Sequence, residues 1–427
     1  MKNRVRLLVS AIAAASASMA APTVLASGYK LNEQSAAGAG NAYAGRAAVV
    51  EDASIVFYNP AGMVKLKRAE ITVGGSYVDA TGDFNLDSYT NGAGKTYNSV
   101  DGSPYSDGGD FIPSAVVPYI YYASPINDKF AAGFGIFVPF GTNTDYSNNF
   151  VGGGFADQTK VTSVEFQPAI AYRVNDQLSV GFGLDITYLQ GLLSKQIDTV
   201  PYNENLKYLN GGENPAHAGL GFAELTDEQW SDFSGFDNHY EVEGDDWQVG
   251  YNLSLMWDVN QDITIGVSYR SEMEFTLKGD SEFKKDQGVF GLTKAPADIA
   301  GTTVTAGDYI VAPVDGVTGS VPKQKSEVPI TTPQSLTISY AHQLTDQFQL
   351  VAGATWTQWS VFEDFDVKSA ESSPGMIENL GGLGNGYIGH IEENWNDTVA
   401  AAIGINYQLN DDWLLRAGYA NDQSPVS

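Results

Sequence analysis

The stretch that decides the fold is Leu178-Ser179-Val180-Gly181-Phe182-Gly183-Leu184-Asp185-Ile186-Thr187-Tyr188. Large apolar side chains occupy every second position, and small or polar side chains occupy the positions between them. Because successive side chains of a β-strand point to opposite faces, such a strand has one apolar face and one small, polar face. Its length is that of a tilted strand crossing a lipid bilayer. The stretch therefore predicts a transmembrane β-strand.

The same alternation recurs in ten further runs along the chain. They cover about 70–77, 117–121, 130–138, 159–174, 247–257, 263–269, 333–344, 348–360, 395–409 and 413–420. The polar faces carry Glu165, Asp185 and Arg270, which favours a wet or plugged barrel interior, and aromatic residues gather at the ends of the runs. A secreted β-sandwich, which also alternates, is the competing interpretation.

The connections between the runs alternate in length. Short turns carry Asn or Asp, as at Asn127-Asp128, Asn175-Asp176 and Asn410-Asp411. Long polar connections cover about 81–111, 143–158, 193–244, 279–332 and 366–392. Short turns opposite long loops are typical of outer-membrane barrels. Eleven runs are an odd number, whereas bacterial single-chain barrels have even numbers of strands, so we expect strands to be missing at the C-terminal end.

Composition supports a membrane barrel and excludes other classes. Charged residues make up 17% of the 427 residues, aromatic residues make up 12%, and there are 46 glycines. The absence of cysteine excludes disulfide scaffolds and thiolate metal sites. The net charge of −28 repels nucleic acid phosphates, so no nucleic acid partner is expected.

The first residues predict export. Lys2, Arg4 and Arg6 precede a short Ala-rich apolar run, and Val24-Leu25-Ala26 supplies small residues for cleavage after Ala26. An N-terminal membrane anchor is the alternative. We therefore expect a signal peptide at 1–26, a plug at 27–68 and a barrel at 69–427, in the outer membrane of a Gram-negative cell.

Residues 28–62 lack the alternation and are rich in Ala and Gly, which is typical of a compact plug. Asn59 is a good helix N-cap and Pro60 suits the first helical position, so a short helix is predicted from Pro60 towards Leu66. A simple turn is the alternative. The apolar residues just before, including Phe57, either line a ligand pocket or pack the plug against the wall.

The order of several short motifs resembles the FadL family of outer-membrane transporters for long-chain fatty acids and other hydrophobic compounds. The matching stretches are Gly28-Tyr29-Lys30-Leu31-Asn32-Glu33, Gly38 to Gly45, Asn59-Pro60-Ala61, Phe134-Gly135-Ile136-Phe137-Val138-Pro139-Phe140-Gly141, Tyr269-Arg270-Ser271-Glu272, Trp356-Thr357-Gln358-Trp359-Ser360 and Leu415-Arg416-Ala417-Gly418.

The resemblance implies an all-β, antiparallel transmembrane barrel of about fourteen strands, of which about eleven are present here. It also implies an N-terminal hatch of short helices inside the lumen. Tyr29, Asn59, Pro60 and Ala61 would belong to this hatch. Ligand would be captured among the outer loops, pass to a deeper pocket and leave sideways through the wall.

A weak patch of wall is predicted where proline and glycine gather. If Asn127-Asp128 is a two-residue turn, Pro118 lies opposite Phe137 and Pro139 lies opposite Val116. Proline cannot donate to a sheet, and Gly133 and Gly135 weaken the same strand. We expect this patch to be the lateral gate, with Phe137 and Phe140 as ligand contacts; a harmless bulge is the alternative.

A fatty acid carboxylate needs a cation. Lys195 and Lys368 each follow a strand at its outer end, and the resemblance makes them candidates for contacting the ligand headgroup. Solvated loop lysines are the alternative.

Catalytic and metal sites are not expected. No Gly-x-Ser-x-Gly or His-Glu-x-x-His motif occurs, and no cofactor is predicted. The sequence thus favours a monomeric channel, in contact with outer-membrane lipid and lipopolysaccharide, for passive uptake of long-chain fatty acids. The alternatives are an aromatic hydrocarbon channel, an outer-membrane lipid hydrolase, and a structural or adhesive barrel.

Overall fold

The structure is a computed structural model that describes residues 28–90, 96–103, 105–148, 150–154, 157–196, 238–285, 290–294, 309–313, 323–370 and 386–426. The predicted signal peptide lies outside the described residues. The helices are α2 (Ala36–Ala39), α3 (Ile55–Tyr58), η1 (Pro60–Lys65) and η2 (Trp359–Val361). The described helices include none with the length and hydropathy needed to cross a membrane.

Antiparallel strands make up most of the described chain. They are β1 (Glu70–Val78), β2 (Tyr89–Thr90), β3 (Thr96–Tyr97), β4 (Ala115–Pro125), β5 (Phe130–Phe137), β6 (Gly141–Asp145), β7 (Gln158–Arg173), β8 (Leu178–Gln196), β9 (Asn238–Asp258), β10 (Ile263–Arg270), β11 (Met273–Lys285), β12 (Phe290–Lys294), β13 (Tyr309–Pro313), β14 (Lys323–Thr332), β15 (Ser335–Thr345), β16 (Phe348–Thr357), β17 (Asp364–Ser369), β18 (Tyr387–Glu392), β19 (Thr398–Asn410) and β20 (Trp413–Asn421).

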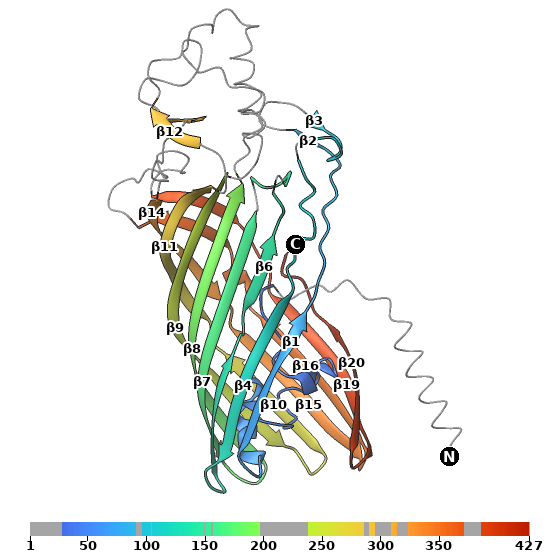
Figure 1. The fold of residues 1–427 in the computed structure, drawn as a ribbon. Helices are drawn as coiled ribbons and strands as arrows, with labels where there is room; N and C mark the ends of the chain where they lie inside the picture. The colour runs from blue at the N-terminus through green and yellow to red at the C-terminus, as the bar shows by residue number, and fades with distance from the viewer. Residues whose placement is uncertain are drawn as a thin grey trace, which may run out of the picture.

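Among the described residues, one large sheet forms the wall. Its main path is β1-β4-β5-β7-β8-β9-β10-β15-β16-β19-β20, and these strands tilt and curl around an interior (Figure 1). The eleven strands of this path are the eleven runs that the alternation predicted. The transmembrane β-barrel fold class is therefore confirmed.

Burial along β8 follows the predicted two faces. Asp185 and Thr187 are buried on the interior face, whereas Val180 and Phe182 are 37% and 43% exposed on the outer face. An apolar face turned outward is stable only in lipid, since exposed apolar surface is costly in water. The β-sandwich interpretation, which would bury the apolar face, is wrong.

Several predicted long connections overlap strands, which corrects the predicted loop boundaries. β11 and β14 form a ten-pair ladder from Met273↔Thr332 to Glu282↔Lys323, so that β14 and the end of β11 lie within the expected loop 279–332. β8 and β9 likewise pair up to Gln196↔His239, inside the expected loop 193–244. In these missed strands the apolar side chains, such as Phe275 and Val328, point inward and polar ones, such as Lys278, point outward. Their alternation therefore runs in the opposite sense to that of the predicted membrane-crossing runs.

The predicted register of β4 against β5 is wrong by one residue. Tyr119 pairs with Phe137, and Pro118 instead faces Gly75 of β1. Asn127 Oδ1 accepts hydrogen bonds from the backbone N–H groups of both Lys129 and Phe130, which draws one more residue into the turn. Pro139 is also not inside a strand, because it lies between β5 and β6.

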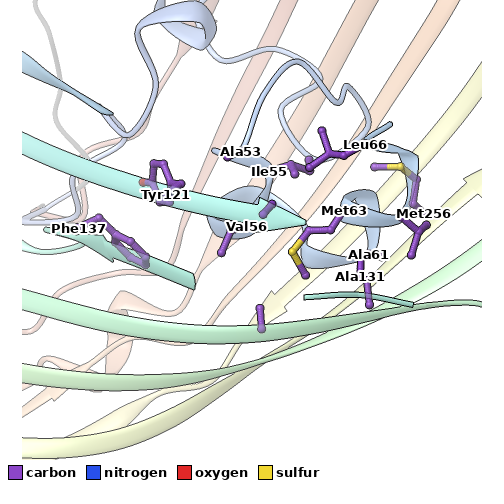
Figure 2. Packing of buried hydrophobic residues seen from close by; sticks show 14 of the residues in the cluster. Ala53, Ile55, Val56, Ala61, Met63, Leu66, Tyr121, Ala131, Phe137 and Met256 are labelled. Atoms are coloured by element: carbon purple, nitrogen blue, oxygen red, sulfur yellow. The ribbon is translucent and has the colours of Figure 1, made fainter. Parts of the chain in front are cut away.

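Residues 28–69, termed the N-terminal segment, pack inside the wall. Ile55, Val56, Ala61 and Met63 are buried against wall residues that include Tyr121, Ala131, Phe137 and Met256 (Figure 2). The predicted helix start is confirmed, as Asn59 caps η1 by accepting a hydrogen bond from Ala61 N at 3.1 Å.

Candidate functional site

The wall is interrupted beside the start of the N-terminal segment. β4 pairs with β5 from Tyr119 to Pro125, while β6 pairs with β7, so within the described residues no ladder joins β4 to β6. We call this place the β4/β6 break. It lies where the prolines Pro118 and Pro139 predicted a weak patch.

The N-terminal segment supplies the missing backbone partners at the β4/β6 break. Leu31 N donates to Pro139 O at 2.9 Å, and Gly141 N donates to Tyr29 O at 2.8 Å. Gln34 Nε2 donates to Val138 O at 2.6 Å. Because an unpaired backbone group is costly at membrane depth, these bonds hold the segment in the break.

A buried apolar cluster fills the lumen beside this break. Its residues come from β7, β8, β9, β11, β14, β17 and η2 as well as from the N-terminal segment. They are Tyr29, Phe140, Val161, Leu189, Val242, Met273, Phe275, Leu277, Val328, Ile330, Trp359, Phe362 and Val367. We call this set the lumen cluster. A barrel interior is ordinarily polar, so this concentration of apolar side chains marks the candidate site.

Tyr29 lies at the centre of an aromatic group within the lumen cluster. Its ring is 4.7 Å from that of Trp359, 5.8 Å from those of Phe140 and Phe362, and 5.9 Å from that of Trp395. Its hydroxyl donates to Thr331 O at 3.3 Å. Tyr29 therefore connects the β4/β6 break with β14 and η2.

Asn59 anchors the other end of the N-terminal segment. Asn59 Nδ2 donates to Ala47 O at 2.6 Å and to Leu255 O of β9 at 3.0 Å. Ser179 Oγ of β8 donates to Ala61 O at 2.9 Å. The predicted hatch residues Asn59, Pro60 and Ala61 are thus all buried where the segment meets the wall.

A buried charged network lies between the anchor and the lumen cluster. Arg270 Nη1 contacts Glu165 Oε1 at 2.5 Å and Asp185 Oδ2 at 2.9 Å. Its guanidinium also lies 4.8 Å from the ring centroid of Phe57 and 5.7 Å from that of Phe137. These side chains therefore meet in the interior, as the polar faces of the runs predicted.

The predicted ligand contacts Phe57 and Phe137 lie together. Their rings are 4.8 Å apart in an edge-to-face arrangement, and Phe137 is buried on the lumen face. Phe140 is apart from this pair and belongs to the lumen cluster. The contacts of Phe57 are with other side chains of the interior, so packing and ligand contact both remain compatible with its position.

Gly133 and Gly135 lie away from the β4/β6 break. Both are within fully paired parts of β5, opposite Ala123 and Tyr121 of β4. A Cβ atom at Gly133 would come within 2.5 Å of Met63 Sδ and 2.6 Å of Val56 Cγ2. Gly133 therefore makes room for the N-terminal segment, and the expected single patch of two prolines and two glycines is not what the structure brings together.

The two lysines proposed for the headgroup point to different sides of the wall. The unbroken alternation of β8 places Lys195 on the lumen face with Leu189 and Asp185. Lys368 lies on the face of β17 opposite that of the buried Val367, and its Nζ is 3.6 Å from Asp366 Oδ2. Lys195 alone of the two faces the lumen.

Sequence reasoning missed two cations inside the N-terminal segment. The backbone of Lys30 pairs with that of Phe140 in an isolated antiparallel β-bridge. Arg46 donates hydrogen bonds to Asn32 Oδ1 at 2.9 Å and to Thr355 Oγ1 at 2.6 Å. Burial, together with the positive charges of Arg46 and Arg270, lowers the pKa of Lys30 to about 7. Burial also lowers the pKa of Arg46. A signal was present for Arg46, which is a basic residue in an otherwise small, largely apolar stretch.

Trp359 was also missed as a site residue, although it lies in one of the motifs that carry the family resemblance. It has the parity of Thr355 and Thr357, which are buried on the interior face of β16. Alternation therefore already points Trp359 inward, and η2 follows β16 there and contributes it to the lumen cluster. This parity was the available signal.

Two hollows lie near the residues described above. A hollow of about 560 Å³ lies on the outer face, against Ile170, Phe182 and Leu253. A smaller one of about 70 Å³ lies beside Arg46 and Tyr43 in the interior. Within the described part of the chain, no group of three or more His, Cys, Asp or Glu side chains is placed to hold a metal ion.

Comparison with known proteins matches this architecture. The chain is 32% identical to an outer membrane protein of Neisseria meningitidis serogroup B, over 100% of this chain and 81% of that protein. It is 25% identical to the long-chain fatty acid transport protein of Salmonella typhi, over 93% of this chain and 78% of that one. Against the crystal structure of a Pseudomonas aeruginosa FadL homologue the TM-score is 0.66, with 26% identity, 94% of this chain and 82% of that chain covered.

The matching family is described as outer membrane protein transport protein (OMPP1/FadL/TodX), and the match covers residues 17–427. Its members are transport proteins for hydrophobic compounds in the Gram-negative outer membrane. The resemblance drawn from the short motifs is therefore confirmed, and this chain belongs to the OMPP1/FadL/TodX family of outer-membrane transport proteins.

Proposed function

We propose that this transporter takes up long-chain fatty acids across the outer membrane by passive transfer. The observation that carries the proposal is the lumen cluster, an apolar set of side chains where a barrel interior is ordinarily polar. Lys30, which pairs with Phe140 of this cluster, supplies a positive charge for a carboxylate below about pH 7, and a pure hydrocarbon does not need that charge.

The proposed route begins among the outer connections. Tyr105, Phe150 and Val151 form a second buried apolar group there, in which Tyr146 stacks on Phe150 with ring centroids 4.3 Å apart. A fatty acid captured at this level meets Lys195 on the lumen face of β8 before it reaches the lumen cluster. This order supports capture outside and binding inside.

The proposed exit is the β4/β6 break. Residues 27–68 act as the hatch and residues 69–427 as the barrel, after removal of residues 1–26 as a signal peptide. The hatch closes the break through its bonds to Pro139 and Gly141, and moving Tyr29 would uncover the break and the lumen cluster together.

The working unit is proposed to be a monomer in contact with lipopolysaccharide.

Uptake of radiolabelled oleate by cells that lack their own fatty acid transporter tests the proposal. Cells producing the full chain are expected to take up oleate faster than cells with an empty vector. Phe275→Ser should abolish the gain, because Phe275 is buried in the lumen cluster, whereas Ile126→Ser, on an exposed turn, should retain it.

Three results would redirect the assignment. Folded protein in the outer membrane with no oleate uptake would reject the proposal. Uptake of toluene without oleate would establish the aromatic hydrocarbon alternative. Release of fatty acid from phospholipid by purified protein would favour a lipid hydrolase.

A further inference from the structure

Trp359 carries a buried hydrogen-bond donor that the protein leaves unused. Its side chain is 0% exposed, and its indole Nε1 has no hydrogen-bond partner among the described residues. Buried polar groups are nearly always paired, because an unpaired one costs roughly 1–3 kcal/mol. Such an exception in a binding region calls for a partner that arrives later.

The neighbouring tryptophan shows that an unpaired indole is not a property of the whole aromatic group. Trp395 lies 5.2 Å from Trp359 between ring centroids, and its Nε1 donates to Glu393 Oε2 at 2.8 Å. Two similar rings in contact therefore differ in the partner of the N–H group and in burial, since Trp359 is fully buried and Trp395 is half-buried.

The nitrogen edge of Trp359 faces the start of the N-terminal segment. A Cβ atom built on Gly28 would lie 2.7 Å from Trp359 Cζ2 and 2.9 Å from Cε2, the carbon bonded to Nε1. Gly28 has φ +54°, a conformation that favours glycine, so the backbone can lie close against this edge. The donor therefore lies beside the part of the segment that closes the β4/β6 break.

We propose that Trp359 Nε1 is an oxygen-selecting contact: it donates a hydrogen bond to the carboxylate of a ligand whose hydrocarbon chain packs among the lumen cluster. This inference rests on the proposed transport function and names the residue that selects the carboxylate of its substrate. The apolar side chains bind any hydrocarbon tail, whereas the indole N–H adds affinity only for a ligand that presents an acceptor.

Equilibrium dialysis with radiolabelled dodecanoate and dodecane tests the proposal on full-length protein in lipid nanodiscs, after subtraction of binding to empty nanodiscs. Trp359→Phe should weaken dodecanoate binding by about tenfold, the effect of one hydrogen bond to a charged group. Dodecane binding should change by less than about twofold, because no hydrogen bond is involved. Trp395→Phe is the matched control and should leave the ratio of the two affinities unchanged.

A second substitution distinguishes the loss of the hydrogen bond from misfolding of the protein. Benzothienylalanine at position 359 replaces the N–H group with sulfur at nearly the same ring size, and it should reproduce the selective loss. Equal losses for both ligands, no loss for either, or an equal loss in Trp395→Phe would overturn the proposal.

Raman spectra of the indole ring provide a readout that does not depend on affinity. The difference between wild type and Trp359→Phe should show a free N–H group without ligand and a hydrogen-bonded one with dodecanoate. A hydrogen-bonded band in ligand-free protein would contradict the claim that the Trp359 N–H group has no partner before ligand binds. Wild type that binds neither ligand would reject the proposed function itself, whereas oleate uptake that is insensitive to the benzothienyl substitution would reject only this inference.

Discussion

At the scale of single residues, Lys30 has the most unusual environment in the N-terminal segment. Its pKa falls from an ordinary 10.5 to about 7 because it is buried and lies near Arg46 and Arg270. Between these two pH values the unfolded chain holds a proton that folded Lys30 has lost. The contribution of Lys30 to stability therefore rises with pH across this window, and below about pH 7 its buried charge is destabilising.

A pH dependence of ligand binding follows from this lysine. If the Lys30 ammonium attracts the fatty acid carboxylate, dodecanoate should bind about tenfold more weakly at pH 9 than at pH 6, as a charged hydrogen bond is lost. Lys30→Met should bind weakly at both values, whereas Lys67→Met, at an exposed position, should follow the wild type. Isothermal titration in nanodiscs measures this, and an unchanged pH profile in Lys30→Met would contradict it.

Gly133 gives a second prediction at this scale. A leucine there would collide with Met63 and Val56, so we expect Gly133→Leu to push the N-terminal segment away from the wall. Cells should then become sensitive to bulky antibiotics such as vancomycin, which the segment otherwise excludes. Gly75→Leu is the control, because a Cβ at Gly75 meets no atom closer than 3.5 Å. Equal sensitivity of the two variants would show that the segment accommodates the side chain.

At the scale of elements, η1 depends on one asparagine for several bonds. Asn59 caps the helix and also satisfies the carbonyl groups of Ala47 and Leu255. A lost cap costs about 1 kcal/mol, and each buried carbonyl left unpaired costs roughly 1–3 kcal/mol. The attachment of η1 to the wall therefore depends strongly on this residue.

Asn59→Ala is expected to lower the free energy of local opening of residues 55–66 by roughly 3–7 kcal/mol. Hydrogen exchange followed by mass spectrometry should show faster exchange there, with strand exchange unchanged. Asn260→Ala removes an asparagine that accepts from Asp262 N and Ile263 N in an exposed turn, and it should leave residues 55–66 protected. Protection that survives Asn59→Ala would mean that packing alone holds η1.

At the scale of the whole molecule, the N-terminal segment and the wall meet at a residue pair that a disulfide can lock. Lys30 faces Phe140 in an antiparallel bridge flanked by the bonds of Leu31 and Gly141. Residues facing each other in this way have Cα atoms about 4.5 Å apart, which a disulfide can span. The chain contains no cysteine, so an introduced pair has no competitor.

The double substitution Lys30→Cys with Phe140→Cys should stop oleate uptake under oxidising conditions, and a reducing agent should restore it to the level of the single variants. Thr90→Cys with Thr96→Cys is the control, because their hydroxyls are 2.8 Å apart in an exposed pairing of β2 with β3. Full uptake by the locked protein would exclude the β4/β6 break as the exit.

Much of the fold could be predicted because its signals are local. Period-two alternation located all eleven strands of the main path, and Asn59-Pro60 located the start of η1. The register of β4 on β5 was missed by one residue, since the asparagine that lengthens the turn acts through its side chain. The outer end of β9 and the strand β11 were missed because their apolar side chains, such as Val242 and Phe275, face the lumen instead of the lipid.

The sequence by itself determined the positions of the main strands, the outward apolar face and the capped start of η1, because each follows from neighbouring residues. Only the tertiary structure decided that Tyr29 reaches Thr331 and that Lys195 faces inward while Lys368 does not. It also decided that Trp359 is buried with no hydrogen-bond partner for its indole among the described residues. Those properties depend on groups hundreds of residues apart in the chain, and burial and hydrogen-bond pairing exist only once such groups have been brought together.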